Sequence, residues 1–313
     1  MNQEFAAISR LFQQRTPFKH TSTQVGNGDD ASTHAIPDGF ELVVSTDTAV
    51  EAVHWPQDMP LDIAGNRAIN AALSDLAAMG ATPAWLWLAI MAKDTTSLSS
   101  MSDGIVQACL IHKVELAGGD TVRSSTNSIN VTVGGLLPKG QAMLRTHAQV
   151  GDDVWLLGNT GLAAAGLKQW FQGEKNGCFV PYFQNIKPLY NQGITLRKLG
   201  IRCCIDISDG LLQDAGHIVK GSTLGIHIDL AHIQTLACYQ QLLPHFDEET
   251  CLKKVLNGGE DYALLCTAPA SKRQALQSID AQHIGTCVQG EGVHLIHEGE
   301  IVDYNIKGYD HFA

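Results

Sequence analysis

Short apolar runs alternate with longer amphipathic or alanine-rich stretches along the whole chain. The apolar runs, bounded by glycine, proline and polar residues, predict strands at residues 41–45, 128–137, 154–157, 202–207, 224–230 and 261–266. The longer stretches predict helices at residues 61–79, 99–116, 162–171 and 211–220. Residues 173–192, rich in aromatics and prolines, predict no clear element, and the tail alternates through residues 294–304.

Both halves of the chain therefore mix strands with helices. The 313 residues exceed the size at which one core usually keeps growing. A polar, glycine-containing joint at residues 145–152 precedes the strand at 154–157. We predict two mixed α/β (α+β) domains, over residues 1–145 and 146–313.

Composition narrows the class of protein. Hydrophobic residues make up 44% of the chain, and the longest apolar run, residues 83–92, is too short to span a bilayer. The first residues carry no basic stretch before an apolar one, so we expect no membrane association and a cytoplasmic location. Eight cysteines without a Cys-x-x-Cys pair indicate free thiols.

A net charge of −11 argues against a nucleic-acid partner. An acidic protein can still bind polyphosphates when metal ions supply the positive charge.

Aspartate recurs beside glycine, serine or threonine in five short segments. They are Gly28-Asp29-Asp30, Ser45-Thr46-Asp47, Leu73-Ser74-Asp75, Gly118-Gly119-Asp120-Thr121 and Asp206-Ile207-Ser208-Asp209-Gly210. Each segment alone is typical of a turn. Together they indicate a phosphate site with Mg²⁺, which prefers carboxylate and hydroxyl oxygens and would relieve the repulsion between the ionised carboxylates.

Other features leave alternatives open. Gly158-Asn159-Thr160-Gly161 is either a phosphate loop or a tight strand-to-helix turn. Gly258-Gly259-Glu260-Asp261-Tyr262 is either a turn with two solvated acids or a carboxylate aimed at a substrate. Arg145 suits both a surface charge and a polyphosphate clamp, and His54 suits both packing and substrate contact.

Six ordered motifs resemble those of the thiamine-monophosphate kinases, within the superfamily of aminoimidazole ribonucleotide synthetase and selenophosphate synthetase. The resemblance covers nearly the whole chain, down to residues 307–312. The motifs are Gly28-Asp29-Asp30-Ala31, Ser45-Thr46-Asp47 with Glu51-Ala52-Val53-His54, Asp75 to Ala81, Gly118-Gly119-Asp120-Thr121, Ile205 to Leu211, and Gly258-Gly259-Glu260-Asp261-Tyr262.

The resemblance implies ATP-dependent phosphorylation of thiamine monophosphate to thiamine diphosphate, the last step of thiamine diphosphate biosynthesis. It implies a homodimer whose N-terminal domains pair through their sheets, with each active site in the cleft between the two domains. By motif matching, Mg²⁺ ions would be held by Asp30, Ser45, Thr46, Asp47, Asp75, Asp120, Asp206 and Asp209. ATP would contact Gly119, Asp120, Arg145 and Ser208. The thiamine phosphate would contact His54, Glu260 and Tyr309.

The chain departs from the family pattern at a few positions. Ala52 and Trp55 stand where glycine and phenylalanine are common, Val122 replaces a common threonine, and Ile306 replaces a common aromatic. Selenophosphate synthetase carries a reactive cysteine near its N-terminus, whereas the first cysteine here is Cys109. A Mg²⁺-dependent phosphohydrolase and a nucleotide-binding regulator without catalysis are the alternatives from other classes.

Overall fold

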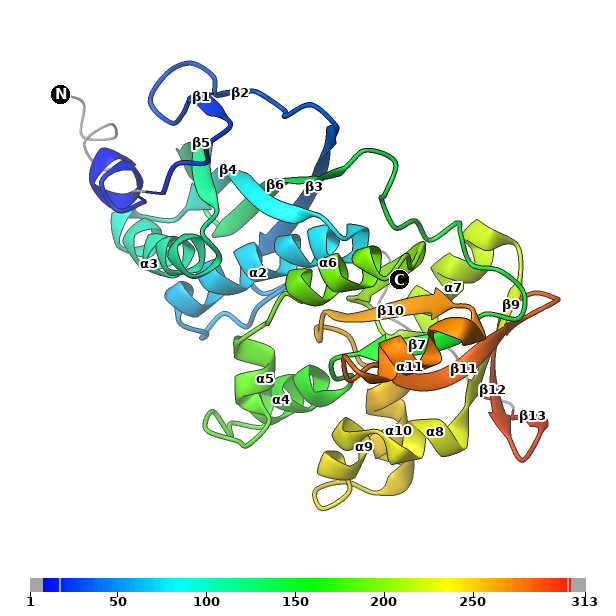
Figure 1. The fold of residues 1–313 in the computed structure, drawn as a ribbon. Helices are drawn as coiled ribbons and strands as arrows, with labels where there is room; N and C mark the ends of the chain where they lie inside the picture. Colours follow the sequence, from blue (N-terminus) through cyan, green and yellow to red (C-terminus); the bar gives the residue numbers. More distant parts are fainter. Residues whose placement is uncertain (1–7, 17, 303, 305–313) are drawn as a thin grey trace. The chain divides into compact units, whose positions relative to one another are not determined.

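The computed structural model describes residues 8–16, 18–302 and 304 (Figure 1). Contacts divide the chain into two compact units, Met1–Leu76 with Ala81–Gly140 and Ala77–Gly80 with Gln141–Ala313. We keep the division after residue 145 as our proposal for the domain boundary.

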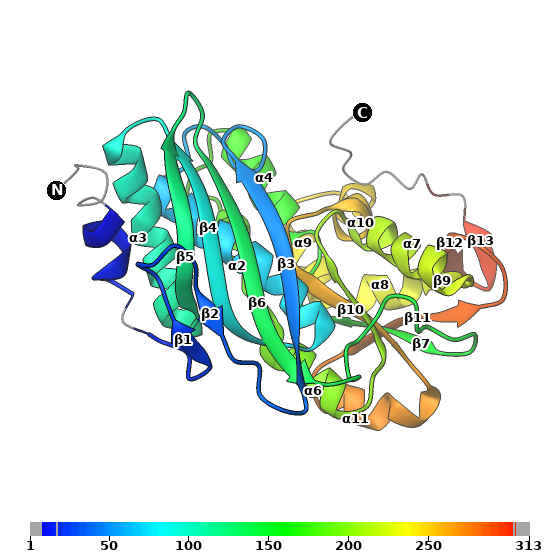
Figure 2. The ribbon, with the colours of Figure 1, turned by 90° about the horizontal axis from the view of Figure 1, so that it is seen from above.

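The first unit is built around a four-stranded sheet in the order β3-β6-β4-β5 (Figure 2). Strands β4 and β5 are parallel and joined through α3, whereas β6 pairs antiparallel with both β3 and β4. Helices α2 and α3 cover one face of this sheet, and the short β1–β2 pair lies on the other (Figure 2). The elements are η1 (Ser9–Gln13), β1 (Thr23–Val25), β2 (Thr33–His34), β3 (Phe40–Val50), α2 (Leu61–Met79), β4 (Thr82–Ala92), α3 (Thr95–His112), β5 (Glu115–Arg123) and β6 (Ser128–Pro138).

Helices α2 and α3 pack with very close backbones. A methyl group added at Gly104 of α3 would overlap the carbonyl oxygen of Asp62, and one added at Gly65 of α2 would overlap that of Met101. Other buried positions of α2 are alanines, such as Ala68 and Ala72, whose small side chains let neighbouring elements pack close to the helix. Small residues therefore set the position of α2 against its neighbours.

The sheet face away from these helices is partly uncovered. Trp85 and Trp87 are covered there, because their indole N–H groups donate to Thr23 and Ser32 of the N-terminal arm, each at 2.8 Å. Alternate residues of the edge strand β3 remain exposed, and Val44 is 53% accessible. An apolar strip on an edge strand is a site where a second sheet can pack.

The second unit contains a seven-stranded mixed sheet in the order β13-β12-β9-β11-β7-β10-β8. Strands β9 and β12 pair in parallel, and the other neighbours pair antiparallel. The strands are β7 (Asp153–Leu157), β8 (Cys203–Ile207), β9 (Gly225–Asp229), β10 (Ala263–Ala268), β11 (Gln282–Val288), β12 (Val293–His297) and β13 (Glu300–Val302). The helices are α4 (Leu162–Phe171), α5 (Val180–Gln184), α6 (Tyr190–Lys198), α7 (Leu211–Ser222), α8 (Leu230–Thr235), α9 (Ala237–Leu242), α10 (Glu248–Asn257), η2 (Ala270–Lys272) and α11 (Arg273–Gln277).

Both faces of this larger sheet are buried. Along β7, Val154 and Leu156 join one apolar cluster, whereas Trp155 and Leu157 join another. This explains why β7 and β10 are buried at every position and read as continuous apolar runs rather than alternating ones.

The structure corrects two of the predicted elements. Strand β3 continues to Val50, so Thr46 and Asp47 lie inside it and not at its end. Helix α3 ends at His112, because Lys113 adopts a left-handed conformation with φ of 53° and starts the turn into β5. Gly118 to Asp120 therefore belong to a strand and not to a loop after a helix.

Other predictions are confirmed. Helices α2 and α4 have the predicted bounds, and β6 runs from Ser128 to the expected stop at Pro138. The eight thiols are free, seven of them buried and Cys178 exposed.

In the described part of the chain, no helix combines the length and apolar character that crossing a membrane requires.

Candidate active site

Asp75 and Ser45 are two predicted site residues that contact each other directly. The Ser45 hydroxyl, on β3, donates to Asp75 Oδ2, on α2, at 2.5 Å. Asp47 lies two residues along the same strand and points to the same face, because side chains alternate along a strand. Three oxygen-bearing side chains thus share the helix-covered side of the sheet.

Thr46 and Asp120 project from the opposite face. Thr46 Oγ1 lies 2.9 Å from Thr132 Oγ1 across the β3–β6 pair, and the same face continues through Asn130 and Ala89 to Asp120. Three strand spacings separate β3 from β5, which corresponds to about 14 Å. One ion cannot bind both Asp47 and Asp120 of a single sheet at that separation.

Asp30 lies in the exposed connection between β1 and β2. The arm that carries it is fastened to β5 by the buried Glu115 carboxylate, which accepts from the Thr23 hydroxyl at 2.6 Å and from the His20 N–H at 2.8 Å. Burial lowers the pKa of His20 and of His34, whose rings pack on Trp85. The loop with Asp30 therefore projects from an anchored base.

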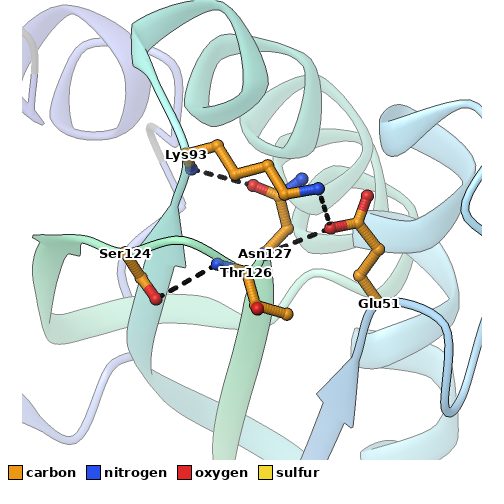
Figure 3. A network of polar contacts seen from close by, with 5 residues as sticks. All are labelled: Glu51, Lys93, Ser124, Thr126 and Asn127. Atoms are coloured by element: carbon orange, nitrogen blue, oxygen red, sulfur yellow. Dashed lines mark hydrogen bonds and ion pairs between the residues drawn. The ribbon is translucent and has the colours of Figure 1, made fainter.

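His54 closes a tight turn directly after β3. Its ring Nδ1 accepts from the Val50 N–H at 3.0 Å, so the neutral ring carries its proton on Nε2. The preceding Glu51 is buried, pairs with the Lys93 ammonium, and accepts from the Asn127 N–H at 3.4 Å (Figure 3). Asn127 Oδ1 in turn accepts from the Lys93 N–H at 3.0 Å. This network fixes the base of the His54 turn.

Ala52, inside the same turn, adopts φ of 65°, a left-handed conformation that glycine adopts with less strain. We expect Ala52→Gly to stabilise the protein by about 0.5 kcal/mol, because relief of the left-handed strain slightly exceeds the entropy that glycine loses on folding. Urea denaturation measures the change. Ala275, in α11, is not strained in this way, so Ala275→Gly should lower the stability by about 1 kcal/mol. Equal losses of stability in both variants would contradict the strain that we assign to Ala52.

In the second unit, two predicted segments are bound to each other through their backbones. Glu260 N–H donates to the Ser208 carbonyl at 2.8 Å, and Tyr262 N–H donates to the Ile207 carbonyl at 2.9 Å. A methyl group at Gly259 would overlap the Ser208 carbonyl. The glycines of both motifs therefore permit a close approach of backbones that sets Glu260 beside the Asp206–Gly210 segment.

Two acidic residues that motif matching did not assign hold these loops. Asp214 accepts from the Asp209 and Gly210 N–H groups at 3.1 and 3.2 Å, and burial raises its pKa to about 7. Asp261 accepts from the Gly161 and Ala163 N–H groups at 2.6 and 2.9 Å.

The N-terminus of α4 is thus occupied by a carboxylate of its own chain, which favours the strand-to-helix turn over a phosphate loop for residues 158–161.

Three further predicted site residues are Arg145, Gly119 and Tyr309. Arg145 is exposed, and its carbonyl accepts from the Ser222 hydroxyl at 3.0 Å. A side chain on Gly119 would overlap the Leu88 carbonyl of the neighbouring strand. Tyr309 and Ile306 lie outside the described residues.

The oxygen donors fit Mg²⁺ by their chemistry, since they are carboxylates and hydroxyls. Within residues 8–16, 18–302 and 304, no group of three or more histidine, cysteine, aspartate or glutamate side chains is placed to hold a metal ion. The predicted ligands come instead from separate strands, a helix and loops of both units.

Comparisons with known proteins match nearly the whole chain. The model of the AIR synthase related protein N-terminal domain matches residues 28–137, and that of the C-terminal domain matches residues 149–298. Thiamine-monophosphate kinase of Escherichia coli (strain K12) is 38% identical over 327 residues, which cover 99% of this chain and 98% of that protein.

Two solved structures are also similar to this chain over nearly its whole length. The crystal structure of thiamine-monophosphate kinase from Stenotrophomonas maltophilia K279a is 33% identical, with a TM-score of 0.84 over 96% of this chain and 98% of the other. A structure of AaThiL complexed with AMPPCP and TMP shares the fold at 24% identity, with a TM-score of 0.78 over 99% of this chain and 96% of the other.

Proposed function

This chain belongs to the AIR synthase related protein family and, within it, to the thiamine-monophosphate kinases, and from that membership we propose that it transfers the γ-phosphoryl group of ATP directly to thiamine monophosphate. The observation that carries the proposal is the 38% identity to the Escherichia coli enzyme along 99% of the chain. The binding of AMPPCP and TMP by AaThiL supports it, since we take these to be an ATP analogue and thiamine monophosphate.

The acceptor supplies its own nucleophile. A phosphate monoester has its second pKa near ~6, so thiamine monophosphate presents an ionised oxygen at neutral pH. No strong general base and no side-chain nucleophile are needed. The obstacle is repulsion between two phosphates, where each unit pair of like charges 4 Å apart costs about 4 kcal/mol at an effective dielectric of 20.

We assign the oxygen-bearing side chains to Mg²⁺ ions, which neutralise phosphate charge and stabilise the transferring phosphoryl group when bound. The separation of Asp47 from Asp120 by three strand spacings supports more than one ion. The proposed ligands are Asp30, Ser45, Thr46, Asp47, Asp75, Asp120, Asp206 and Asp209.

For ATP we propose Gly119, Asp120, Arg145 and Ser208 as contacts. For the thiamine phosphate we propose His54, Glu260 and Tyr309. The neutral His54 ring carries its proton on Nε2, which suits donation to a phosphate oxygen. Residues 1–145 would thus supply most metal and ATP contacts, and residues 146–313 would add metal and substrate contacts.

The decisive assay incubates the pure protein with ATP, Mg²⁺ and thiamine monophosphate and measures thiamine diphosphate and ADP. We expect equal amounts of both products. ADP and inorganic phosphate formed regardless of thiamine monophosphate would instead identify a phosphohydrolase. With a chiral γ-phosphorus, inversion supports direct in-line transfer, and retention would reveal a covalent intermediate.

We also propose a homodimer formed through the uncovered sheet face of the first unit. Phe40, Leu42 and Val44 alternate along β3 and are 44 to 53% exposed, and Met91 and Val122 extend the apolar surface over β4 and β5. An exposed apolar strip of this kind favours burial against a second copy. The cytoplasm is the compartment we propose, since ATP is available there and thiols stay reduced.

Leu42→Glu is expected to weaken dimerisation by about 100-fold or more, because it places an unpaired carboxylate in the buried interface. Analytical ultracentrifugation measures the dissociation constant. The matched control is Ile111→Glu, at an exposed apolar position of α3 that is 60% accessible. It should leave the dimer intact, and an unchanged dimer in Leu42→Glu would locate the interface elsewhere.

A further inference from the structure

Three segments of the second unit pack against one another. They are residues 158–163 before and into α4, residues 206–210 at the end of β8 and beyond it, and residues 257–262 from the end of α10 towards β10. Methyl groups added at Gly161, Gly210 or Gly258 would each collide with backbone atoms of residues 254–257. The backbones in this cluster are therefore packed with no room for side chains between them.

Loop 257–262 is held in an unfavourable conformation. Glu260 and Tyr262 adopt φ of 72° and 54°, a left-handed backbone that costs a residue with a side chain roughly 1 to 2 kcal/mol. Two such residues flank Asp261. Strain of this kind persists only where the surroundings over-determine it, and it concentrates at functional sites.

Asp261 supplies the restraint. Its Oδ2 accepts from the N–H of the N-cap residue Gly161 at 2.6 Å and its Oδ1 from the Ala163 N–H at 2.9 Å, so both oxygens bind the N-terminus of the ten-residue helix α4. The positive end of the helix dipole strengthens these bonds to a charged acceptor. The contact joins positions 100 residues apart in the sequence.

We propose that Asp261 is a positioning residue, which fixes the Glu260 carboxylate for substrate by tying its strained loop to the N-terminus of α4. The inference rests on the proposed function, in which Glu260 contacts the thiamine phosphate. Asp261 itself touches backbone N–H groups of its own chain and acts through its neighbour.

The electrostatics of Asp261 agree with this role. Burial raises the pKa of Asp261 to about 7, the neighbouring Glu260 raises it further, and the bonds from Ala163 and Gly161 oppose the shift. Lys254 and Cys238 are further titratable groups that interact with it. Because the folded state binds this proton more tightly than the unfolded chain, stability falls as the pH rises from the ordinary value of 3.8 towards 7. The protein therefore retains a carboxylate here at a cost in stability.

Asp261→Asn tests the proposal, since it keeps the size of the side chain but turns an N–H group towards one of the two backbone donors. We expect the KM for thiamine monophosphate to rise about 10-fold or more and the KM for ATP to stay within about 2-fold. Glu260→Gln should give a comparable rise. Adding Asp261→Asn to it should cost little more, because both changes remove the same contact. Full additivity, or equal effects on both substrates, would overturn the proposal.

Asp153→Asn is the matched control. Asp153 is 2% exposed, pairs with Arg273 at 2.6 Å, and begins the strand β7 whose other end leads into residues 158–163. It should lower stability, because it removes the buried charge that pairs with Arg273, without changing either KM.

Hydrogen exchange without ligands separates this inference from the proposed function. Asp261→Asn should speed exchange at the amides of Gly161, Ala163, Glu260 and Tyr262, and Asp153→Asn should not. Faster exchange in a protein that does not phosphorylate thiamine monophosphate would leave the loop restraint standing and reject the function. Unchanged exchange would reject the restraint itself.

Discussion

Asp75→Asn is expected to lower kcat/KM for thiamine monophosphate by about 10³-fold or more while the protein stays folded. Asparagine has nearly the same volume, and its amide oxygen can still accept from the Ser45 hydroxyl that lies 2.5 Å from Asp75 Oδ2. What the substitution removes is a negative charge in the proposed Mg²⁺ site. The assay is steady-state kinetics at several Mg²⁺ concentrations, with far-UV circular dichroism and the melting temperature as measures of folding.

Asp62→Asn provides the control on the same helix. Asp62 is an exposed acid in the first turn of α2, far along the helix from Asp75, so its loss should change stability by a few tenths of a kcal/mol and leave kinetics unchanged. A raised Mg²⁺ requirement in Asp75→Asn alone would support the metal assignment. Undiminished activity in Asp75→Asn would refute it.

The ordered motifs identified the family, which the comparisons confirm, better than they predicted the local arrangement of the site residues. The alanine-rich pattern of α2 correctly placed Asp75 near the end of a buried helix, whereas the Mg²⁺ site stays a prediction. The extent of β3 was underestimated, although the β-branched residues Val44, Thr46, Thr48 and Val50 recur at every second position of the sequence. That alternation was a usable signal for where Thr46 and Asp47 lie.

Other features depend on contacts that no local pattern reveals. Helix α3 ends because Lys113 turns left-handed, and β5 then forms by pairing in parallel with β4. The role of Asp261 comes from a bond to a residue 100 positions away, so in the sequence it resembled a solvated turn residue. Contacts between residues far apart in the sequence determine the structure at such positions. A short segment taken alone carries no information about those contacts.

The second large effect is expected at Gly104, where close packing of α2 and α3 leaves no room for a methyl group. Gly104→Ala should destabilise the protein by about 3 kcal/mol, because the new Cβ would overlap the carbonyl oxygen of Asp62 and force the helices apart. The added atom meets rigid helical backbone rather than a side chain that could rotate away. Urea denaturation followed by tryptophan fluorescence measures the loss.

The same substitution at Gly216 of α7 distinguishes packing from helix propensity. A methyl group at Gly216 meets no atom within 4 Å, so Gly216→Ala should gain about 0.5 to 1 kcal/mol from the higher helix propensity of alanine. If Gly104→Ala lowers the stability and Gly216→Ala raises it, the contact between α2 and α3 is the cause of the loss at Gly104. Because α2 carries Asp75 to Ser45, Gly104→Ala should also impair catalysis under conditions where it remains folded. A stable and fully active Gly104→Ala would show that the helices can separate without disturbing the site.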